Sequence, residues 1–478
     1  MPGVPLRQKS VILSVPATAP GVFAPGHLGE LTQVIDFELV DEVLAEHGAV
    51  ERRLRLLPSR VVVYFVLALA LFESCSYRAV WGKLTASLSG LAPAVPAASS
   101  LARARRRVGA APLRALFETI AGPVADRGQA GAFYRGLRTV AVDGTHLHVP
   151  DLEQITWRYP KRGVGTDKEF GYPLLRLLVI VECGTRALLA AAFGPESDGE
   201  TVYAGRLLGC LDATMLLLAD AGFDAIGFLR EVAGTGAQFL VRGSGTRIPT
   251  ITERLPDGSC LARINGAWQV GVGWPVMTVR VVEAWVTVTL ADGTVRTEPW
   301  RLLTSLADHG RYPAAELIEL YHRRWQAETT YLSIKSTMLD GRVLRSRSIA
   351  GIDQEIWALL TVYQGLIRLA ADAVATVPGL PMERISFAVL LEAAGNQVVT
   401  ATGTLTAATN PLRGPIGDII LDNLLPQVKR QRVKARSRKN TTSKYAANAG
   451  THPQQTQTYT FHTHVQVMEN GLASRARK

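Results

Sequence analysis

Hydrophobic positions in the first part of the chain repeat at the spacing of α-helices. An uninterrupted apolar run covers Val61–Phe72, after which Tyr77, Val80 and Trp81 recur at helical spacing. The run is shorter than the roughly 20 residues that a membrane-spanning helix requires, so it predicts a buried helix of a folded domain. We therefore expect a mainly helical region over residues 36–120.

Short apolar strands follow, and two of them lead into aspartates. Residues 138–142 precede Asp143, and residues 215–219 precede Asp220. Both carboxylates are therefore expected at strand ends. Two further apolar segments on either side of a Gly-Thr turn predict an antiparallel hairpin, residues 174–182 and 186–193.

The pattern then alternates and becomes helical again. Polar and apolar residues alternate between residues 238 and 306, with Asp292-Gly293 as a hairpin turn, which predicts an all-β segment. Helical spacing returns over residues 313–332 and 354–376. This order predicts an α/β fold with a mixed-sheet core, a β-rich insertion, an N-terminal helical domain and a helical, basic C-terminal region.

Charge changes this picture by indicating the partner. The 478 residues, enough for several domains, include 52 Lys and Arg against 41 Asp and Glu, a net charge of +11. This excess favours a polyanionic partner, nucleic acid before an anionic membrane surface. Residues 426–444 are rich in Lys and Arg and contain no acid, which predicts a disordered, phosphate-binding segment. The four cysteines form no C-x-x-C pair, so we expect neither zinc nor disulfides, and a reducing cytosol.

A basic helix is predicted after Ser99-Ser100, with the two serines at its start. Four arginines lie close together in it: Arg103, Arg105, Arg106 and Arg107. A basic helix is more often a solvated face than a base-reading helix, so we predict contacts with DNA phosphates rather than with bases.

Another predicted helix combines a carboxylate with cations. Tyr321, Arg324, Glu328 and Lys335 fall within a sector of about 60° at about 100° per residue. A site that handles metal and phosphate needs this combination, because carboxylates bind metal and cations bind phosphate. The alternative is an ordinary helix with surface ion pairs.

Asp143, Asp220 and Glu328 together are the candidate catalytic acids. An α/β fold can bring strand ends beside a helix, and three carboxylates can hold two metal ions. In two-metal phosphoryl transfer, ions about 3.5–4 Å apart activate the attacking oxygen and stabilise the leaving oxygen. Mg²⁺, or Mn²⁺ in its place, suits an oxygen donor set without thiolates.

Three motifs resemble those of the insertion-element-4-type transposases of the DDE superfamily. They are Asp143-Gly144-Thr145, Asp220-x-Gly222-Phe223 and Tyr321-x-x-Arg324-x-x-x-Glu328-x-x-x-x-x-x-Lys335. The resemblance runs from about Val61 through Gly171-Tyr172-Pro173 to the basic tail. It implies an RNase H-like core with a β-rich insertion between the second aspartate and the glutamate.

The same resemblance implies roles and partners. The three acids would ligate metal, and Tyr321, Arg324 and Lys335 would bind phosphates at the element end. Water would free a 3′ hydroxyl, which forms a hairpin that is reopened before strand transfer. The implied partners are double-stranded DNA, as terminal inverted repeats and target, and a second copy in a homodimer on DNA. The implied location is the bacterial cytoplasm, at the nucleoid.

The predicted segments follow from the element order and this resemblance. They are residues 1–130, an N-terminal helical DNA-binding region; 131–237, the first part of the catalytic core; 238–308, the β-rich insertion; 309–400, the second part of the core with the Glu328 helix; and 401–478, a basic, partly disordered C-terminal region.

Several residues near the motifs carry their own expectations. Trp300 is the candidate platform for an unstacked base, and filling the core of the insertion is its alternative role. Trp325 is expected to pack beneath the site. The family pattern has an arginine where this chain has Ala221, which weakens the case for phosphate contacts there. His146 and His148 lack a third soft ligand, so they are expected to be structural.

Two other functions fit parts of the sequence. A nuclease or resolvase of the same fold would share the metal chemistry through the first cut, and the Tyr-Arg-Glu-Lys stripe separates a transposase from it. An inactivated or domesticated relative that only binds element ends is favoured by Ala221 and opposed by the three retained acids. A membrane-surface protein is disfavoured because the basic tail has no apolar face.

Overall fold

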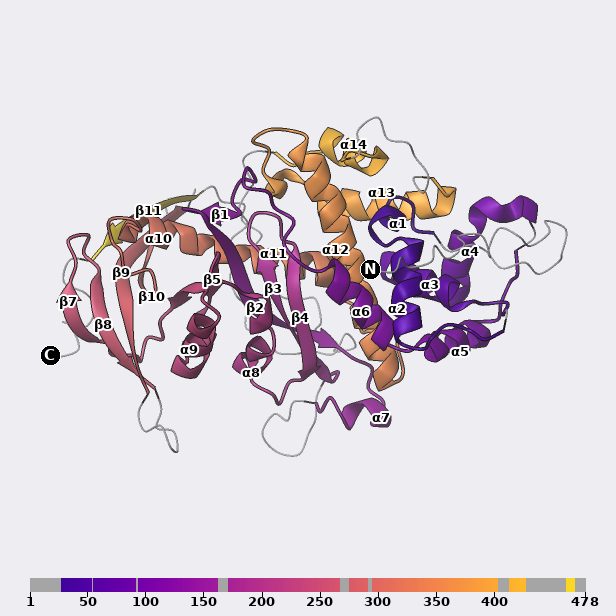
Figure 1. Ribbon diagram of the computed structural model, residues 1–478, viewed down its shortest axis with the longest axis horizontal. Helices are drawn as coiled ribbons and strands as arrows, with labels where there is room; N and C mark the ends of the chain where they lie inside the picture. The colour runs from indigo at the N-terminus through magenta and orange to yellow at the C-terminus, as the bar shows by residue number, and fades with distance from the viewer. Residues whose placement is uncertain are drawn as a thin grey trace, which may run out of the picture. The chain divides into compact units, whose positions relative to one another are not determined.

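The computed structural model divides the chain into two compact units (Figure 1). It describes residues 27–53, 55–91, 93–161, 171–266, 275–290, 295–402, 412–426 and 461–468. The helical unit comprises Met1–Ala121, Ser333–Pro378 and Ile385–Leu424, and the sheet unit comprises Gly122–Leu332, Gly379–Arg384 and Leu425–Lys478. The basic residues predicted to bind phosphate after Pro426 lie outside the described residues.

The helical unit is built around one long apolar helix. Helices α3, α6 and α14 pack against α12 (Ile349–Ala375). Among the described residues α12 is the one helix long and apolar enough to cross a membrane, but 78% of its apolar window is buried in the protein, as in a core helix. The other elements of the unit are α1 (Leu31–Val34), α2 (Phe37–Glu46), α3 (Ser59–Leu71), α4 (Tyr77–Leu84), η1 (Ala86–Leu91), α5 (Ala98–Val108), α6 (Ala111–Ile120), η5 (Ser333–Met338), α13 (Phe387–Thr400) and α14 (Pro415–Asp422).

Two sequence expectations can be compared directly with these helices. The apolar run from Val61 forms the buried helix α3, as predicted, because a helix that is apolar on all sides must be covered on all sides. Helix α5, however, begins at Ala98 with Ala97 as its N-cap. Ser99 and Ser100 therefore lie inside its first turn and do not cap it.

The core of the sheet unit is a mixed five-stranded sheet in the order β4-β3-β2-β5-β6. β2 (Leu137–His148) is antiparallel to β3 (Leu174–Glu182) and parallel to β5 (Met215–Ala219). β3 is antiparallel to β4 (Leu188–Pro195), and β5 is parallel to β6 (Gln238–Arg242). This arrangement confirms the expected RNase H-like core and the predicted hairpin.

The β-rich insertion continues the same sheet. The end of β10 (Val295–Thr304) pairs with β6, and β9 (Val276–Leu290), β8 (Cys260–Asn265) and β7 (Thr250–Arg254) follow in that order. Because β6 is paired with β5, it belongs to the core sheet, although the sequence grouped it with the insertion. The insertion therefore leaves the core after β6 and returns to it along β10.

Another strand, β11 (Phe461–Val467), pairs antiparallel with β9. Its register runs from Phe461 opposite Leu290 to Val467 opposite Ala284. It covers the part of the β9 edge that lies beyond the pairing of β9 with β8. The sequence predicted this region only as basic and partly disordered, so the strand is a new finding.

Helices cover both faces of the core sheet. Helices α8 (Glu200–Gly205) and α9 (Ile226–Gly234) lie beside the core sheet in Figure 1. Their buried side chains share a hydrophobic core with Val140 and Val142 of β2. Successive side chains of a strand point to opposite faces, so Asp143 points away from that core, towards α11. The remaining elements are β1 (Phe133–Tyr134), α7 (Glu153–Thr156), η2 (Leu208–Cys210), η3 (Ala221–Phe223), α10 (Ala314–Tyr321), η4 (His322–Arg324), α11 (Trp325–Leu332) and η6 (Met382–Arg384).

Candidate active site

Asp143 and Asp220 stand at matching positions on neighbouring parallel strands. The last paired residues of β2 and β5 are Ala141 and Leu218, and each aspartate follows two positions later. Asp220 directly follows β5, as predicted. β2 instead continues to His148 through its pairing with β3, so Asp143 lies within a strand, which corrects its predicted place at a strand end. Both carboxylates are thus held at one edge of the core sheet.

Arg324 lies between two of the three acids. Its Nη2 donates a 2.8 Å hydrogen bond to Oε1 of Glu328, and its Nη1 lies 3.6 Å from Oδ2 of Asp143. The side chains of Arg324 and Asp143 keep only 13% and 17% of their exposure, whereas Glu328 keeps 29%. The structure therefore brings these three predicted residues together, with Glu328 the most open of them.

Burial raises the pKa of the Asp143 carboxyl to about 6. Arg324 and the Gly144 N–H, which donates to Oδ1 of Asp143 at 2.9 Å, lower this pKa, whereas the charges of Asp220 and Glu328 raise it. The charges of Asp220 and Glu328 thus act on the Asp143 carboxylate, and this gathering of negative charge favours a bound cation.

Tyr321 is buried, and it holds the strand that carries Asp220. Its hydroxyl donates a 3.2 Å hydrogen bond to the carbonyl of Ala219, and burial raises its pKa to about 12. Its hydroxyl is therefore engaged with the backbone. The predicted phosphate contact requires instead a hydroxyl that is open to solvent.

Trp300 packs against this tyrosine. The two rings meet edge to face at 5.5 Å, and the guanidinium of Arg242 lies 5.1 Å from the indole centroid. The buried indole N–H has no hydrogen-bond partner among the described residues. Trp300 therefore lies beside a residue of the motif, where a base platform is expected.

The helix that carries the motif is not continuous, contrary to the prediction. After α10 the chain forms the 3₁₀ turn η4, then α11, and then the π-helix η5, which contains Lys335. These turns have different numbers of residues, so a stripe calculated for one regular α-helix does not describe the whole segment. Lys335 belongs to the helical unit, and its phosphate contact stays a prediction. Trp325, expected to be packed, is 56% exposed.

Tyr331 is a residue of the site that the sequence did not indicate. Its hydroxyl bonds to the carbonyl of Asp143 and accepts a 3.2 Å hydrogen bond from the Val179 N–H. It thereby fixes α11 to β2 and β3. Tyr331 lies three positions after Glu328, on the same helix face, but a tyrosine at that spacing looks like any core residue.

Glu200 also lies at this edge of the sheet, at the start of α8. Its Oε1 is 3.8 Å from Nη1 of Arg176, whose Nη2 is 4.0 Å from Glu196. Glu196 is in turn 3.2 Å from Nε2 of His146, which fits the structural role expected for that histidine. No motif marks Glu200, because only the packing of α8 brings it to the aspartates.

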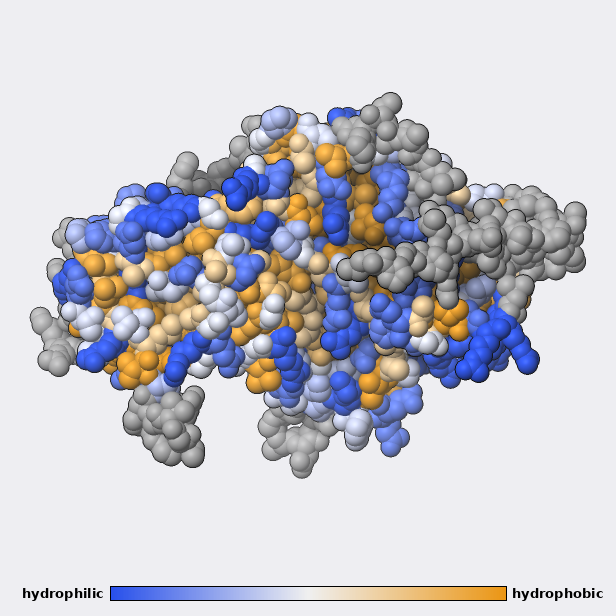
Figure 2. Space-filling model, viewed as in Figure 1, coloured by the Kyte–Doolittle hydropathy of each residue, from blue (hydrophilic) through white to orange (hydrophobic). Residues whose placement is uncertain are grey.

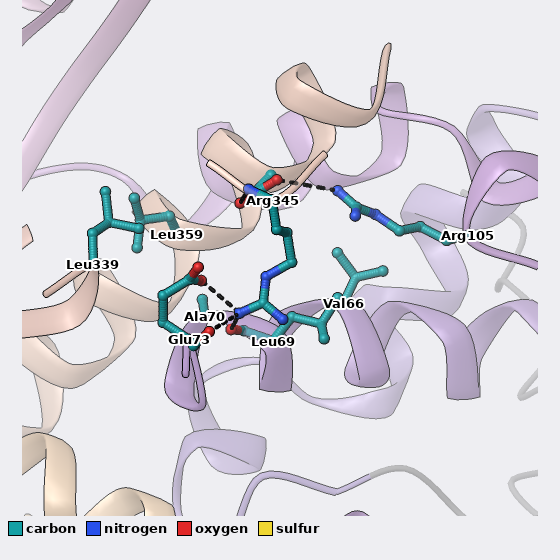
Figure 3. A pocket seen from close by; sticks show the side chains of 9 residues that line it. Val66, Leu69, Ala70, Glu73, Arg105, Leu339, Arg345 and Leu359 are labelled. Carbon is teal, nitrogen blue, oxygen red and sulfur yellow. Dashed lines mark hydrogen bonds and ion pairs between the residues drawn. The ribbon is translucent and has the colours of Figure 1, made fainter. Parts of the chain in front are cut away.

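Arg105, one of the four predicted DNA contacts in α5, is turned into the helical unit. It is 4% exposed and donates hydrogen bonds to Gln354, to Tyr77 Oη at 2.6 Å and to the Gly351 carbonyl at 2.7 Å. This corrects its predicted role: a buried guanidinium with internal partners is structural. Figure 3 shows Arg105 among the residues that line a small cavity of this unit. Figure 3 also shows Arg345 reaching Glu73 beside the same small cavity.

The other arginines of α5 stay accessible. Arg103 and Arg106 are exposed, and Arg107 keeps 31% of its side-chain exposure beside Glu51, 3.1 Å away. Strongly hydrophilic residues gather over α5 in Figure 2. The predicted phosphate-binding face is therefore reduced to these three residues.

The donor set of the site fits a hard divalent cation. Its three acids offer only carboxylate oxygens, which Mg²⁺ and Mn²⁺ prefer. As the side chains stand, no three His, Cys, Asp or Glu residues in the described part of the chain are arranged around a metal. The Arg324 guanidinium instead supplies positive charge between Asp143 and Glu328, so it acts as a stand-in cation.

Comparisons with known proteins identify the family of the chain. Residues 25–118 match the family Insertion element 4 transposase N-terminal, and residues 134–364 match the family Transposase DDE domain. The transposase InsG for insertion sequence element IS4 of Escherichia coli (strain K12) is 29% identical over 340 residues, 70% of this chain and 75% of that protein. The putative transposase InsZ of Escherichia coli (strain K12) is 30% identical over 184 residues, 38% of this chain and 58% of that protein.

A cryo-EM structure of the piggyBac transposase synaptic complex with hairpin DNA is also similar. The likeness covers 90% of this chain and 92% of that chain, with 11% identity and a TM-score of 0.41.

The match to the Transposase DDE domain family defines the class as a DDE transposase. Within that class, the chain belongs to the insertion-element-4-type transposases. It is therefore a transposase of an insertion element, and its family implies cleavage of DNA and transfer of strands.

Proposed function

We propose that this transposase cuts the ends of its element and joins them to target DNA by metal-assisted phosphoryl transfer at Asp143, Asp220 and Glu328. The observation that carries the proposal is that Asp143 and Asp220 each stand two positions beyond the last paired residues of the parallel strands β2 and β5, with Arg324 between Asp143 and Glu328. Two divalent ions, Mg²⁺ or Mn²⁺, would activate the attacking oxygen and neutralise the leaving oxygen when bound. The three carboxylates would hold them.

The residues around the acids keep this geometry rigid. Tyr331 fixes the helix of Glu328 to the backbone of Asp143, and Tyr321 fixes the end of β5 before Asp220. When Asp143 and Glu328 are neutralised by divalent ions, Arg324 is released from both carboxylates. Its planar guanidinium can then bind a phosphate of the element end.

The reaction proceeds through successive in-line displacements. Water attacks a phosphodiester, the bond to the 3′ oxygen breaks, and a 3′ hydroxyl and a 5′ phosphate remain. That hydroxyl attacks the opposite strand and closes a hairpin, which water reopens before the 3′ hydroxyl attacks target DNA. Each step forms one P–O bond and breaks another, and the attacking oxygen loses a proton while the leaving oxygen gains one.

The hairpin step needs a base to leave the stack, and an aromatic ring stabilises such a base. Trp300 is the candidate for this role because its ring packs against Tyr321 of the motif. Its indole N–H has no hydrogen-bond partner among the described residues. Trp325 is the second aromatic at the site, and its 56% exposure lets it stack without repacking.

The DNA contacts extend beyond the acids. Exposed Arg103, Arg106 and Arg107, together with Lys335, would bind phosphates of the inverted repeats and the target. Two element ends must be held at once, so we propose a homodimer on the DNA, in the bacterial cytoplasm at the nucleoid.

Cleavage of a labelled element-end duplex tests the proposal. The wild type with Mg²⁺ is expected to give nicks, hairpins and joined products, and Glu328→Gln is expected to give none at equal DNA affinity. Nicks without joining would favour a nuclease of the same fold.

A second outcome bears on Ala221, where the family pattern has arginine. Binding of element ends without cleavage by the wild type would favour an inactivated relative. Gain of cleavage in Ala221→Arg would then identify this position as the cause.

A further inference from the structure

The carboxylate of Glu200 lies between the two motif glycines. A Cβ added to Gly144 would lie 3.0 Å from Oε1 of Glu200, and also 3.0 Å from Cδ1 of Leu178. A Cβ added to Gly222 would lie 3.6 Å from Oε2 of Glu200 and 3.0 Å from Oδ1 of Asp220. Each glycine directly follows, or nearly follows, one of the aspartates, so this carboxylate reaches the backbone of both acidic motifs.

Backbone conformation does not explain these glycines. Neither Gly144 nor Gly222 has the positive φ that favours glycine over other residues. Gly144 is paired within β2 and β3, opposite Leu178, in ordinary strand geometry. A side chain at Gly144 would crowd Glu200 and Leu178, and one at Gly222 would crowd the Asp220 carboxylate, although its 3.6 Å approach to Glu200 would be an ordinary contact.

The position of Glu200 at the start of α8 fixes its carboxylate beside the two acidic motifs. It is the first residue of α8, whose neighbours Tyr203 and Ala204 are buried in the core of the sheet unit. The helix therefore fixes Glu200 beside the sheet edge, and its side chain retains 34% exposure. The guanidinium of Arg176 lies 3.8 Å from its carboxylate, too far for a close hydrogen bond. The ion pair therefore orients the Glu200 carboxylate but leaves its oxygens able to bind a cation.

We propose that Glu200 is a fourth carboxylate of the catalytic centre, which helps Asp143 and Asp220 to hold a divalent cation. The inference rests on the proposed function, since it adds a residue to the same site. Mg²⁺ and Mn²⁺ are coordinated by oxygen, and a carboxylate on the α8 face would complete the coordination that Asp143, Asp220 and Glu328 begin from the α11 face. The missing side chain at Gly144 keeps the space for it beside β2.

Mn²⁺ binding to the full chain without DNA tests this role independently of activity. Titration calorimetry, or the loss of free Mn²⁺ signal in electron paramagnetic resonance, gives the dissociation constant. Glu200→Gln keeps the shape and removes the charge, and it is expected to weaken Mn²⁺ binding on the order of tenfold or more. Glu196→Gln is the matched control, because it removes the other carboxylate near Arg176 and should leave Mn²⁺ binding unchanged.

The outcomes separate this inference from the proposed function. Unchanged Mn²⁺ affinity in Glu200→Gln, with loss of binding in Asp143→Asn, overturns the role of Glu200 alone. Unchanged affinity in Asp143→Asn overturns the metal site itself. If Glu200→Gln shows no cooperative melting, Glu200→Asp decides: the shorter side chain should bind Mn²⁺ more weakly than the wild type, and equal binding overturns the proposal.

Discussion

Arg324 and Glu328 are joined by a 2.8 Å hydrogen bond across the junction of η4 and α11, and the same guanidinium lies 3.6 Å from Asp143. The guanidinium of Arg324 thus places a positive charge beside two of the three candidate acids. In the proposed metal site, the ion and the guanidinium would compete for the same carboxylates, so this side chain would set part of the affinity for metal.

Arg324→Ala is expected to tighten Mn²⁺ binding in the absence of DNA, because it removes the competing cation. We expect a change on the order of tenfold, about 1.4 kcal/mol, and a weaker affinity for element-end DNA. Calorimetry and fluorescence anisotropy measure the two effects. Arg106→Ala, which removes an equal charge from the helical unit, should leave Mn²⁺ binding as it is, and weaker Mn²⁺ binding in Arg324→Ala would contradict the competition.

Neutralising any one of the acids should abolish cleavage while DNA binding persists. Asp143→Asn, Asp220→Asn and Glu328→Gln each remove a proposed metal ligand, and we expect cleavage to fall by on the order of 10²-fold or more, about 3 kcal/mol. Single-turnover cleavage of an end duplex gives the rates. Glu298→Gln, at a 67% exposed side chain on β10, is the control. Normal cutting by one acid variant would remove that residue from the site.

Tyr331→Phe should impair both stability and catalysis. The substitution leaves the Asp143 carbonyl and the Val179 N–H without their partner, which costs about 1–3 kcal/mol. Tyr64→Phe, which removes a buried hydroxyl bonded to the Ile35 carbonyl in the helical unit, should cost a similar amount of stability and leave cleavage intact. Denaturant unfolding and cleavage rates test the contrast, and equal cleavage by both variants would show that Tyr331 has no part in positioning Asp143.

Glu73 should make the stability of the helical unit depend on pH. Burial raises its pKa from 4.5 to about 6, against the opposing effect of Arg345. Between pH 4.5 and about 6 the folded protein keeps a proton that the unfolded chain loses, so stability should fall by about 2 kcal/mol as the pH rises through this window. Melting curves in EDTA should show a shallower slope for Glu73→Gln. Glu118→Gln, an exposed carboxylate on α6, should keep the wild-type slope, and an unchanged slope in Glu73→Gln would refute the assignment.

Removal of β11 should expose the edge of β9. Truncation after residue 460 frees the backbone of β9 from Ala284 to Leu290, and open strand edges promote association of chains. Light scattering after gel filtration should detect oligomers, and the melting temperature should fall. Truncation after residue 468 keeps the strand and serves as the control; identical behaviour of both truncations would show that β11 adds nothing to the sheet.

Sequence patterns indicated the core strands and the acids because these depend on local order. The apolar strand before Asp220 and the buried helix from Val61 are visible in a few consecutive residues. The roles of Arg105 and Trp325 were wrongly predicted because burial depends on which face of a helix meets a neighbour. Tyr331 and Glu200 were not indicated at all, since only the packing of α11 and α8 on the sheet brings them to the aspartates.

The segment boundaries remain a prediction, and the compact units group the chain differently. Residues from Ser333 onward join the helical unit, although the sequence counted them with the catalytic core. A regular helical period continues through the Glu328 motif in the sequence, whereas the structure changes to 3₁₀ and π turns within it. Such changes follow from tertiary packing and leave no trace in hydrophobic spacing.

The pairing of β9 with β11 also has a consequence for the order of events on the ribosome. β9 is synthesised long before β11, because the whole motif helix and the late helices of the chain lie between them. The segment of β9 from Ala284 to Leu290 therefore leaves the ribosome before its partner strand is made. Its edge remains unpaired with β11 until residue 467 has left the exit tunnel. The sheet unit can close this edge only after all the residues of the acidic site have been made, so a stalled or shortened polypeptide would carry the acids and an open strand together.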